Sequence, residues 1–255
     1  MVCSPRPPPS PAVPCRPLPP HRPHHRGGTR GRPSNLGAVL LLAFDTATPA
    51  VTAAVHDGTA VLAESYEVDA RRHGELLLPT IGDVLRTAGV DKRELTAIAV
   101  GVGPGPYTGL RVGLVTAAAL GHALGLPVHG VCTLDAIAHR ARLDGLTGAF
   151  TAATDARRKE VYWAAYDADG TRTDGPAVDR PGDLTAPQRS VGAGALLYPD
   201  TFPGATGPEH VSAGALADFA ARELAAGREL LPNTPLYLRR PDAQVPAGYK
   251  AVLPA

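Results

Sequence analysis

The 255-residue chain is 44% hydrophobic and carries 25 lysines and arginines against 24 aspartates and glutamates, so it can bury a substantial core. A membrane role is unexpected because no apolar run reaches the roughly 20 uncharged residues that a spanning helix needs. The cysteines at positions 3, 15 and 132 lack Cys-x-x-Cys spacing, which predicts neither a disulfide framework nor a zinc site and suits a reducing cytoplasm.

Residues 1–38 differ in composition from the rest of the chain. They hold six arginines, no acidic residue and many prolines, so we expect a disordered extension. The bias toward Arg, Ala, Gly and Pro is typical of GC-rich coding, in which a valine codon often serves as the start. We therefore hypothesise that the protein begins at Val39 and that residues 1–38 are a start-site artefact.

The net charge of the remaining residues indicates whether the chain could bind nucleic acid by itself. Without the six N-terminal arginines, 19 basic residues face 24 acidic ones, a net charge of about −5. A protein that grips nucleic acid by itself normally carries the opposite sign. If tRNA is involved, we expect another subunit to supply most phosphate contacts.

From Val39 onward, the hydrophobic pattern predicts two successive groups of strands and helices. The first group ends near residue 145 and has three strands with an Asp57-Gly58 hairpin turn, then helix, strand, helix and strand, the order of one ribonuclease-H-like half. Its elements are expected at residues 40–44, 51–56, 60–68, 75–88, 95–100, 108–126 and 128–131. The second group, within 146–255, is expected to be abbreviated, with a strand at 150–154, a hairpin through 161–166 whose turn lies at 167–170, and a helix around 215–226.

The most informative segment is residues 103–111, Gly-Pro-Gly-Pro-Tyr-Thr-Gly-Leu-Arg, which joins a predicted strand to a long helix. Its three glycines allow sharp turning and close approach, and the free N–H groups of the helix start can receive an anion. The segment has neither the Gly-Lys-Ser/Thr ending of a Walker A loop nor the spacing of the dinucleotide fingerprint.

This segment resembles the signature loop of the TsaB (YeaZ) family, whose members are the bacterial partners of TsaD in making threonylcarbamoyladenosine on tRNA. Further segments agree with the family in order and spacing, at residues 44–48, 73–79, 155–162 and 235–240. The resemblance covers about residues 39–242. It implies an α/β fold of the actin/Hsp70/sugar-kinase type, a duplicated ribonuclease-H-like architecture, with a reduced second lobe.

The resemblance also implies a function. The chain would be a cytoplasmic, non-catalytic scaffold subunit that forms a heterodimer with TsaD, helps to recruit the ATPase TsaE, and meets tRNA only indirectly through the complex. TsaD would then transfer threonylcarbamoyl to the adenosine beside the anticodon. The alternative is an active actin-fold enzyme, either a small-molecule kinase or a self-sufficient carbamoyl transferase.

Candidate cofactor-binding residues gather where the first strand ends and the glycine loop begins. A carboxylate with neighbouring hydroxyls can hold hydrated Mg²⁺ beside a nucleotide, which would make this a vestigial nucleotide cleft. The alternative is structural: Asp45 and Thr48 satisfy backbone donors of the turn before Pro49. The candidates are Asp45, Thr46, Gly103, Gly105 and Thr108.

No metal, cofactor or catalytic residue is predicted. TsaD carries a His-x-x-x-His pair that binds its metal, and by the resemblance these two positions fall on Thr133 and Ile137, neither of which can replace a histidine. His139 lies two residues beyond the second position and on a different helical face. No Ser-His-Asp or Cys-His order supports a peptidase.

The predicted partner surface is helical. Small residues recur every fourth position along the helix at 108–126, which would let another helix approach closely, and the helix at 75–88 has an apolar stripe beside it. Packing inside the chain is the alternative for each residue taken singly. The family pairs these two helices with those of TsaD, and self-associates through them when TsaD is absent. The predicted interface residues are Leu77, Leu78, Ile81, Leu85, Gly109, Arg111, Gly113, Ala117 and Gly121.

A short basic run, Arg157-Arg158-Lys159, precedes the strand at 161–166. It could touch tRNA or acidic groups of a partner, and a solvated turn is the more common identity of such runs.

Overall fold

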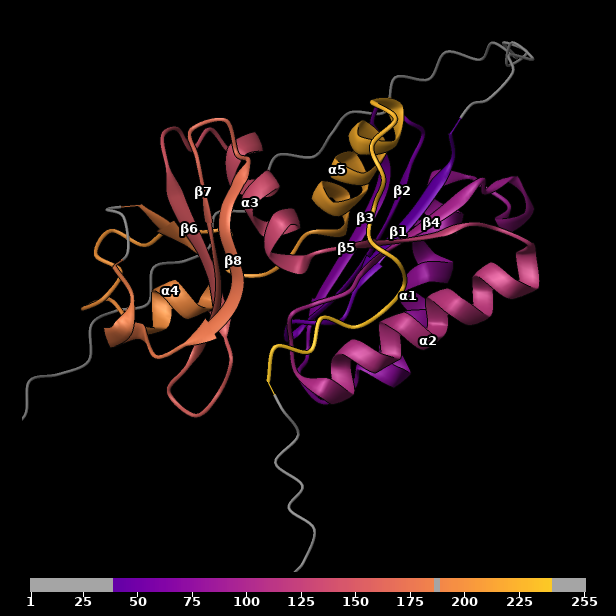
Figure 1. The fold of residues 1–255 in the computed structure, drawn as a ribbon. Coiled ribbons are helices and arrows are strands. Elements are labelled where there is room, and N and C mark those ends of the chain that lie inside the picture. The colour runs from indigo at the N-terminus through magenta and orange to yellow at the C-terminus, as the bar shows by residue number, and fades with distance from the viewer. Residues whose placement is uncertain (1–38, 186–188, 240–255) are drawn as a thin grey trace, which may run out of the picture. The chain divides into compact units, whose positions relative to one another are not determined.

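The computed structural model describes residues 39–185 and 189–239 (Figure 1). The extension at 1–38, the proposed start before Val39 and the segment 240–255, with the last residue of the 235–240 motif, lie outside these ranges.

The first sheet has five strands in the order β3-β2-β1-β4-β5. β1 (Leu41–Asp45), β2 (Ala50–His56) and β3 (Val61–Val68) are antiparallel neighbours, whereas β4 (Ala97–Gly101) and β5 (Val128–Val131) run parallel to β1 and β4 respectively. This strand order is the ribonuclease-H-like arrangement that the sequence predicted.

The predicted hairpin turn between β2 and β3 is confirmed. Gly58 has a φ of +90°, which glycine adopts readily. The Asp57 carboxylate accepts hydrogen bonds from the N–H groups of Thr59 and Ala60, both at 2.9 Å. The Asp-Gly pair therefore supplies both the backbone conformation and the acceptor that the turn needs.

Helices cover both faces of the first sheet, which explains why β1 is buried throughout (Figure 1). Leu42 and Phe44 belong to the core cluster that includes α1 (His73–Ala88) and α2 (Tyr107–Leu124). Leu41 and Ala43, which point the other way, belong to the cluster that includes α3 (Thr133–Leu143) and α5 (Ala213–Ala225). The alternation of side chains along a strand thus divides the residues of β1 between two cores.

The second sheet has four strands in the order β8-β7-β6-β9. β6 (Phe150–Asp155), β7 (Val161–Tyr166) and β8 (Arg172–Asp179) are antiparallel neighbours, and the two-residue β9 (Ser190–Val191) runs parallel to β6. The order and directions repeat those of β3, β2, β1 and β4. The predicted α/β fold, duplicated with a reduced second half, is confirmed.

The elements predicted from the pattern are present, with ends displaced by at most two residues. The predicted hairpin turn at 167–170 is confirmed, with the Gly170 N–H donating to the Asp167 carbonyl at 3.1 Å, and β8 follows it. β9, the short helix α4 (Ala193–Leu197) and the one-turn 3₁₀ helices at Lys92–Glu94 and Pro181–Asp183 were not predicted. Helix α5, expected within the second half, contacts β1, β2 and β3 of the first sheet. The division at residue 145 stays a prediction, because the described residues belong to one compact unit.

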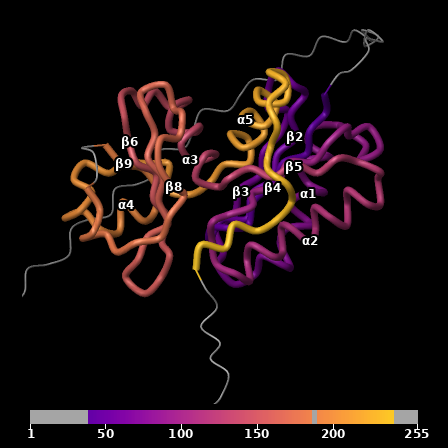
Figure 2. Tube along the Cα trace, viewed as in Figure 1, coloured from indigo at the N-terminus to yellow at the C-terminus, as the bar shows by residue number. Residues whose placement is uncertain are grey.

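The segment after α5 also returns to the first sheet and passes beside β5 and β4 (Figure 2). Leu231 pairs with Gly130 of β5 through two backbone hydrogen bonds, and Leu236 N–H donates to the Val102 carbonyl at 2.8 Å. The Asn233 amide donates to the Leu114 carbonyl of α2 at 3.1 Å. These bonds fix the path of the chain up to Tyr237.

The small-residue stripe of α2 faces the chain's own sheet, which corrects its assignment to a partner surface. A Cβ atom at Gly113 would lie 2.7 Å from Thr46 Oγ1, and one at Gly121 would lie 2.4 Å from a methyl group of Val128. Ala117 is fully buried. Leu77 and Ile81 of α1 are likewise core residues, so these positions are not available to another protein.

Two glycine substitutions test this packing. We expect Gly113→Ala to destabilise the protein by about 1–3 kcal/mol, because the added methyl overlaps a short side chain held by two hydrogen bonds. The matched control is Gly82→Ala on the exposed side of α1, where a Cβ meets no atom within 4 Å. It should stabilise the protein by up to about 1 kcal/mol through helix propensity. Urea unfolding measures both, and equal effects would contradict the assigned packing.

Candidate functional site

The glycine loop between β4 and α2 is packed against the residues that follow β1. A Cβ atom at Gly105 would lie 2.1 Å from the Ala47 carbonyl oxygen, a distance that no side chain permits. Gly103 has a φ of +92°, and its carbonyl accepts the N–H of Thr133 at 2.8 Å. The close approach predicted for these glycines is thus made to the chain itself.

Asp45 is fully buried at the end of β1, and donors of this chain occupy both of its carboxylate oxygens. Oδ1 accepts the N–H of Ala47 at 2.6 Å, and Oδ2 accepts the hydroxyl of Thr133 at 2.7 Å. A Cβ at Gly101 would overlap Oδ2 at 1.6 Å. Burial raises the pKa of Asp45 from 3.8 to about 6, although the two hydrogen bonds act in the opposite direction.

The hydroxyl of Thr46 ties the start of α2 to the end of β1. It donates to the Gly109 carbonyl at 2.8 Å and accepts the N–H of Gly113 at 2.9 Å. These are the two backbone groups that would pair with each other in an uninterrupted helix. The hydroxyl therefore bridges the first turns of α2, and its single proton is already donated within the chain.

The predicted nucleotide-binding residues thus lie close together, but only some of them line a cavity. Asp45, Gly103 and Gly105 make contacts within the chain, as in the structural alternative, and Thr48 Oγ1 accepts the N–H of Ala50 at 3.3 Å. Thr46 and Thr108 also line a cavity of about 290 Å³. Nucleotide binding by the five candidates stays a prediction.

That cavity adjoins a second one of about 300 Å³. The first contains Arg71 from the segment before α1, and the second contains Thr154 of β6 and His210 of the segment before α5. Both contain Arg157. Arg71 and His210 were not predicted as site residues, because neither belongs to a sequence motif. Only the fold brings them to the cavities beside the glycine loop.

The basic run lies in the turn between β6 and β7. Arg157, Arg158 and Lys159 have φ values of 63°, 56° and 62°, a left-handed conformation that residues with a side chain rarely adopt. The Arg157 guanidinium lies 3.3 Å from the Asp155 carboxylate and is two-thirds exposed. The turn is solvated, as the more common identity of such runs predicts, and it also places Arg157 in the wall of both cavities.

The two positions compared with the metal ligands of TsaD are buried in this chain. Thr133 holds Asp45 and accepts the N–H of Gly103 at 3.2 Å, and Ile137 belongs to the core. Within residues 39–185 and 189–239, no three His, Cys, Asp or Glu side chains are grouped so as to hold a metal ion. The sequence indicated Thr133 only as a position where TsaD has a metal-binding histidine. It did not predict the hydrogen bond from Thr133 to Asp45.

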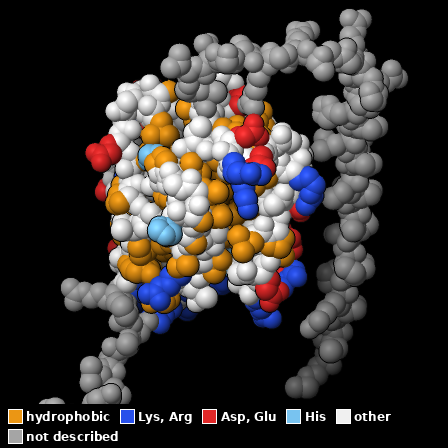
Figure 3. All heavy atoms as spheres, turned by 90° about the vertical axis from the view of Figure 1, so that its right-hand side faces the viewer, with side chains coloured by type: hydrophobic (Ala, Val, Ile, Leu, Met, Phe, Trp, Pro, Cys, Tyr) orange, Lys and Arg blue, Asp and Glu red, His pale blue; other side chains and the backbone are white. Residues whose placement is uncertain are grey.

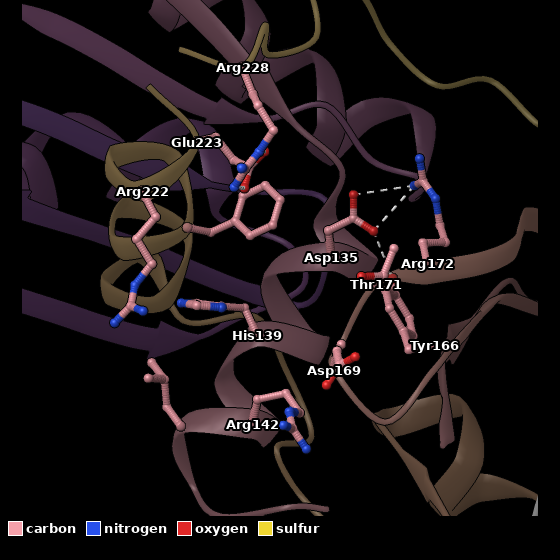
Figure 4. A pocket seen from close by; sticks show the side chains of 13 residues that line it. Asp135, His139, Arg142, Tyr166, Asp169, Thr171, Arg172, Arg222, Glu223 and Arg228 are labelled. Carbon is pink, nitrogen blue, oxygen red and sulfur yellow. Dashed lines mark hydrogen bonds and ion pairs between the residues drawn. The ribbon is translucent and has the colours of Figure 1, made fainter. Parts of the chain in front are cut away.

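A cavity of about 750 Å³ lies between α3, the β7–β8 turn and α5 (Figure 4). Four arginines surround it, and each is already engaged. Arg172 pairs with Asp135 at 3.2 Å, Arg222 with Asp218 at 2.7 Å, and Arg228 with Glu223 at 2.6 Å, while Arg142 donates to the Leu146 carbonyl at 2.7 Å. Because three of these arginines are paired with carboxylates and Arg142 bonds a backbone carbonyl, the charges around the cavity do not favour an anion.

The exposed sides of α1 and α2 carry apolar and small side chains. Leu78 of α1 is 58% exposed and Val115 of α2 is 66% exposed. Ala118 and Ala119 of α2 and Gly82 of α1 are also exposed. Hydrophobic side chains lie across the middle of the face shown in Figure 3. Of the predicted interface residues, Leu78 and Arg111 are exposed and Leu85 is half-buried.

A ring cluster lies at the start of α2. Tyr237 stacks on Tyr107 with ring centroids 5.4 Å apart, the Arg111 guanidinium lies 3.7 Å from the centre of the Tyr107 ring, and Arg111 Nε donates to the Tyr237 hydroxyl at 3.1 Å. The cluster joins two sequence motifs more than 100 residues apart. The sequence contained both motifs and did not show that they meet.

Comparisons with known proteins decide the family. The family model described as TsaD, tRNA N6-adenosine threonylcarbamoyltransferase, matches residues 61–221, which is more than half of the chain. The tRNA threonylcarbamoyladenosine biosynthesis protein TsaB of Escherichia coli is 38% identical over 173 residues, covering 63% of this chain and 74% of that protein. The chain belongs to the TsaB (YeaZ) family.

Other known proteins are similar over more of the chain. An uncharacterized protein of Mycobacterium tuberculosis is 46% identical over 216 residues, 80% of this chain and 93% of that protein. The solved structure of YeaZ from Pseudomonas aeruginosa has a TM-score of 0.69 and 32% identity, covering 78% of this chain and all of that one. The resemblance inferred from the sequence is confirmed, and with it a place in the tRNA threonylcarbamoyladenosine biosynthesis family.

A search of the described part of the chain found no helix long and apolar enough to cross a membrane.

The raised pKa of Asp45 predicts a pH-dependent stability. Between pH 3.8 and about 6 the folded protein binds a proton here that the unfolded chain has lost, so stability falls as the pH rises through this window. The full difference corresponds to about 3 kcal/mol. Asp45→Asn cannot ionise, so its stability relative to wild type should rise by up to that amount between pH 4 and pH 8, as measured by urea unfolding.

Asp57→Asn is the control, because hydrogen bonds from Thr59 and Ala60 lower the pKa of Asp57 to about 2. The contribution of Asp57 is then complete above pH 4, and the difference between this variant and wild type should stay constant from pH 4 to 8. If the stability difference between Asp45→Asn and wild type is also constant from pH 4 to 8, burial does not raise the pKa of Asp45.

Proposed function

We propose that this chain is the non-catalytic scaffold subunit that binds TsaD during synthesis of threonylcarbamoyladenosine on tRNA, in the cytoplasm. Membership of the TsaB family supports the pathway. The observation that carries the binding role is the exposed apolar face of α1 and α2, with Leu78 and Val115 more than half exposed. Contiguous apolar surface of this kind commonly marks a protein contact.

The docking surface differs from the one the sequence suggested. The buried stripe of α2 holds the helix on its own sheet, so a partner must contact the opposite side, where residues 111, 115, 118, 119 and 122 follow one another at helical spacing. On α1, Leu78 and Gly82 have the same spacing. The small residues there would let the helices of TsaD approach closely, as in a four-helix contact.

A scaffold role also agrees with what occupies the position of the catalytic centre. Asp45 and Thr46 are engaged by Thr133, Ala47 and the first turns of α2, and the positions compared with TsaD's metal ligands are a threonine and an isoleucine. In this proposal TsaD performs threonylcarbamoyl transfer to the adenosine beside the anticodon, TsaE docks on the heterodimer, and tRNA meets this chain only through the complex.

Charge substitution on the exposed face tests the proposal. We expect Leu78→Glu and Val115→Glu each to weaken binding to the cognate TsaD by about tenfold or more, roughly 1.4 kcal/mol, because a buried unpaired carboxylate opposes association. Light scattering and calorimetry of the mixed proteins measure the loss. Thermal unfolding of the isolated variants should be unchanged, since both side chains are exposed.

Leu197→Glu on α4 is the matched control, because Leu197 is 55% exposed and lies on a helix beside the second sheet. It should bind TsaD as wild type does. If all three variants bind equally, the face of α1 and α2 is not the docking surface. ATP turnover by the isolated chain, without TsaD, would favour the alternative of an active actin-fold enzyme.

A further inference from the structure

The two small cavities beside the glycine loop adjoin each other. Thr48, Pro49, Pro106 and Arg157 line both of them, so they meet where the residues after β1, the start of α2 and the β6–β7 turn come together. With volumes of about 290 and 300 Å³, they suit the two ends of one small molecule.

The first cavity is built for an anion. Its lining includes the guanidinium groups of Arg71 and Arg157 and no carboxylate. The Arg71 guanidinium has no hydrogen bond or ion pair with other residues of the described ranges, so all its donors are available. The first turn of α2 forms another wall, and no side chain caps that helix terminus. Arg157 is also paired with Asp155 at 3.3 Å, so the main partners for a phosphate are the Arg71 guanidinium and the uncapped N–H groups, with Arg157 beside them.

The second cavity contains two buried side-chain atoms without a hydrogen-bond partner among the described residues. Thr154 is 6% exposed and its hydroxyl has no hydrogen bond, and the His210 side chain is 9% exposed and its Nδ1 has none within the described structure. Unpaired polar atoms at this depth are costly, and a ligand that bonds them removes the cost. The same cavity is lined by the Asp155 and Glu209 carboxylates.

These carboxylates decide which end of a ligand belongs in which cavity. They repel a phosphate and accept hydrogen bonds from hydroxyl groups. We propose that the joined cavities bind a small phosphate monoester whose organic part carries hydroxyl groups. Arg71, Arg157 and the start of α2 hold the phosphate, and Thr154, Glu209 and His210 hold the hydroxylated part. This site is formed by the chain alone and does not depend on TsaD binding.

Calorimetry on the full chain without TsaD tests this site, with inorganic phosphate and ribose 5-phosphate as probes at constant ionic strength. We expect both to bind, and ribose 5-phosphate to bind about tenfold more tightly, because it alone reaches the second cavity. Arg71→Gln should weaken both probes by about tenfold. Arg93→Gln, a loss of an exposed arginine in the 3₁₀ helix Lys92–Glu94, should weaken neither.

Thr154→Val separates the two cavities. It removes only an unpartnered hydroxyl, so the protein should unfold at the same or a higher temperature. It should also reduce the affinity for ribose 5-phosphate to that of phosphate, and leave phosphate binding unchanged. The proposal is overturned if neither probe binds below about 10 mM, if Arg71→Gln and Arg93→Gln behave alike, or if Thr154→Val affects neither probe. Binding of tRNA in the absence of binding by both small probes would also overturn it.

Discussion

The buried carboxylate of Asp45 is the constraint on which the first half of the fold depends. It joins three elements that are distant in the sequence: the end of β1, the turn at Ala47 and the start of α3 at Thr133. Thr133 in turn holds Gly103 through its hydroxyl and its N–H. A fully buried carboxylate is tolerated only when its oxygens are bonded, so Gly101, Gly103 and Thr133 are fixed by the presence of Asp45. The same bonds that stabilise this end of the sheet occupy the group that a metal-dependent enzyme would leave free.

Hydrophobic periodicity predicted the elements of the first sheet because both of its faces are buried and its turns use Asp-Gly and glycine. It predicted the hairpin turn before β8 but not the extent of that strand, which contains Gly175 and Pro176 and lies at the edge of the second sheet, and it did not predict β9, which has two residues. Short and interrupted elements carry too few residues for a period to be measured. Their presence follows from pairing with β7 and β6, which is a tertiary effect.

The small residues of α2 show that a sequence pattern alone cannot assign a helix face to a partner. Their spacing correctly indicated close approach, and it could not tell whether the approaching element belonged to this chain or to another. Gly113 is small because the Thr46 hydroxyl enters the helix at that point. Leu78 and Val115, which are large and exposed, gave no such periodic signal. Burial therefore shows which side of α1 and α2 is exposed, whereas the sequence pattern indicated the two helices and, among the exposed residues, Leu78 and Arg111. Likewise, Arg71 and His210 reach the glycine loop only through the fold.

The repeated strand order explains why cavities form at this edge although the second sheet is reduced. β1 and β6 occupy equivalent places in their sheets, and each is followed by a tight turn to an antiparallel neighbour. In open α/β sheets the crevice beyond the carboxyl ends of the strands is where ligands bind. Residues 47–49 after β1 and Asp155 and Arg157 after β6 line the same hollow. Ala193 and Leu197 of α4 and Glu209 and His210 before α5 complete its wall, so the reduced second half keeps the elements that form its side of the crevice. A buried and hydrogen-bonded Asp45 and a polar crevice beside it are thus compatible in one chain.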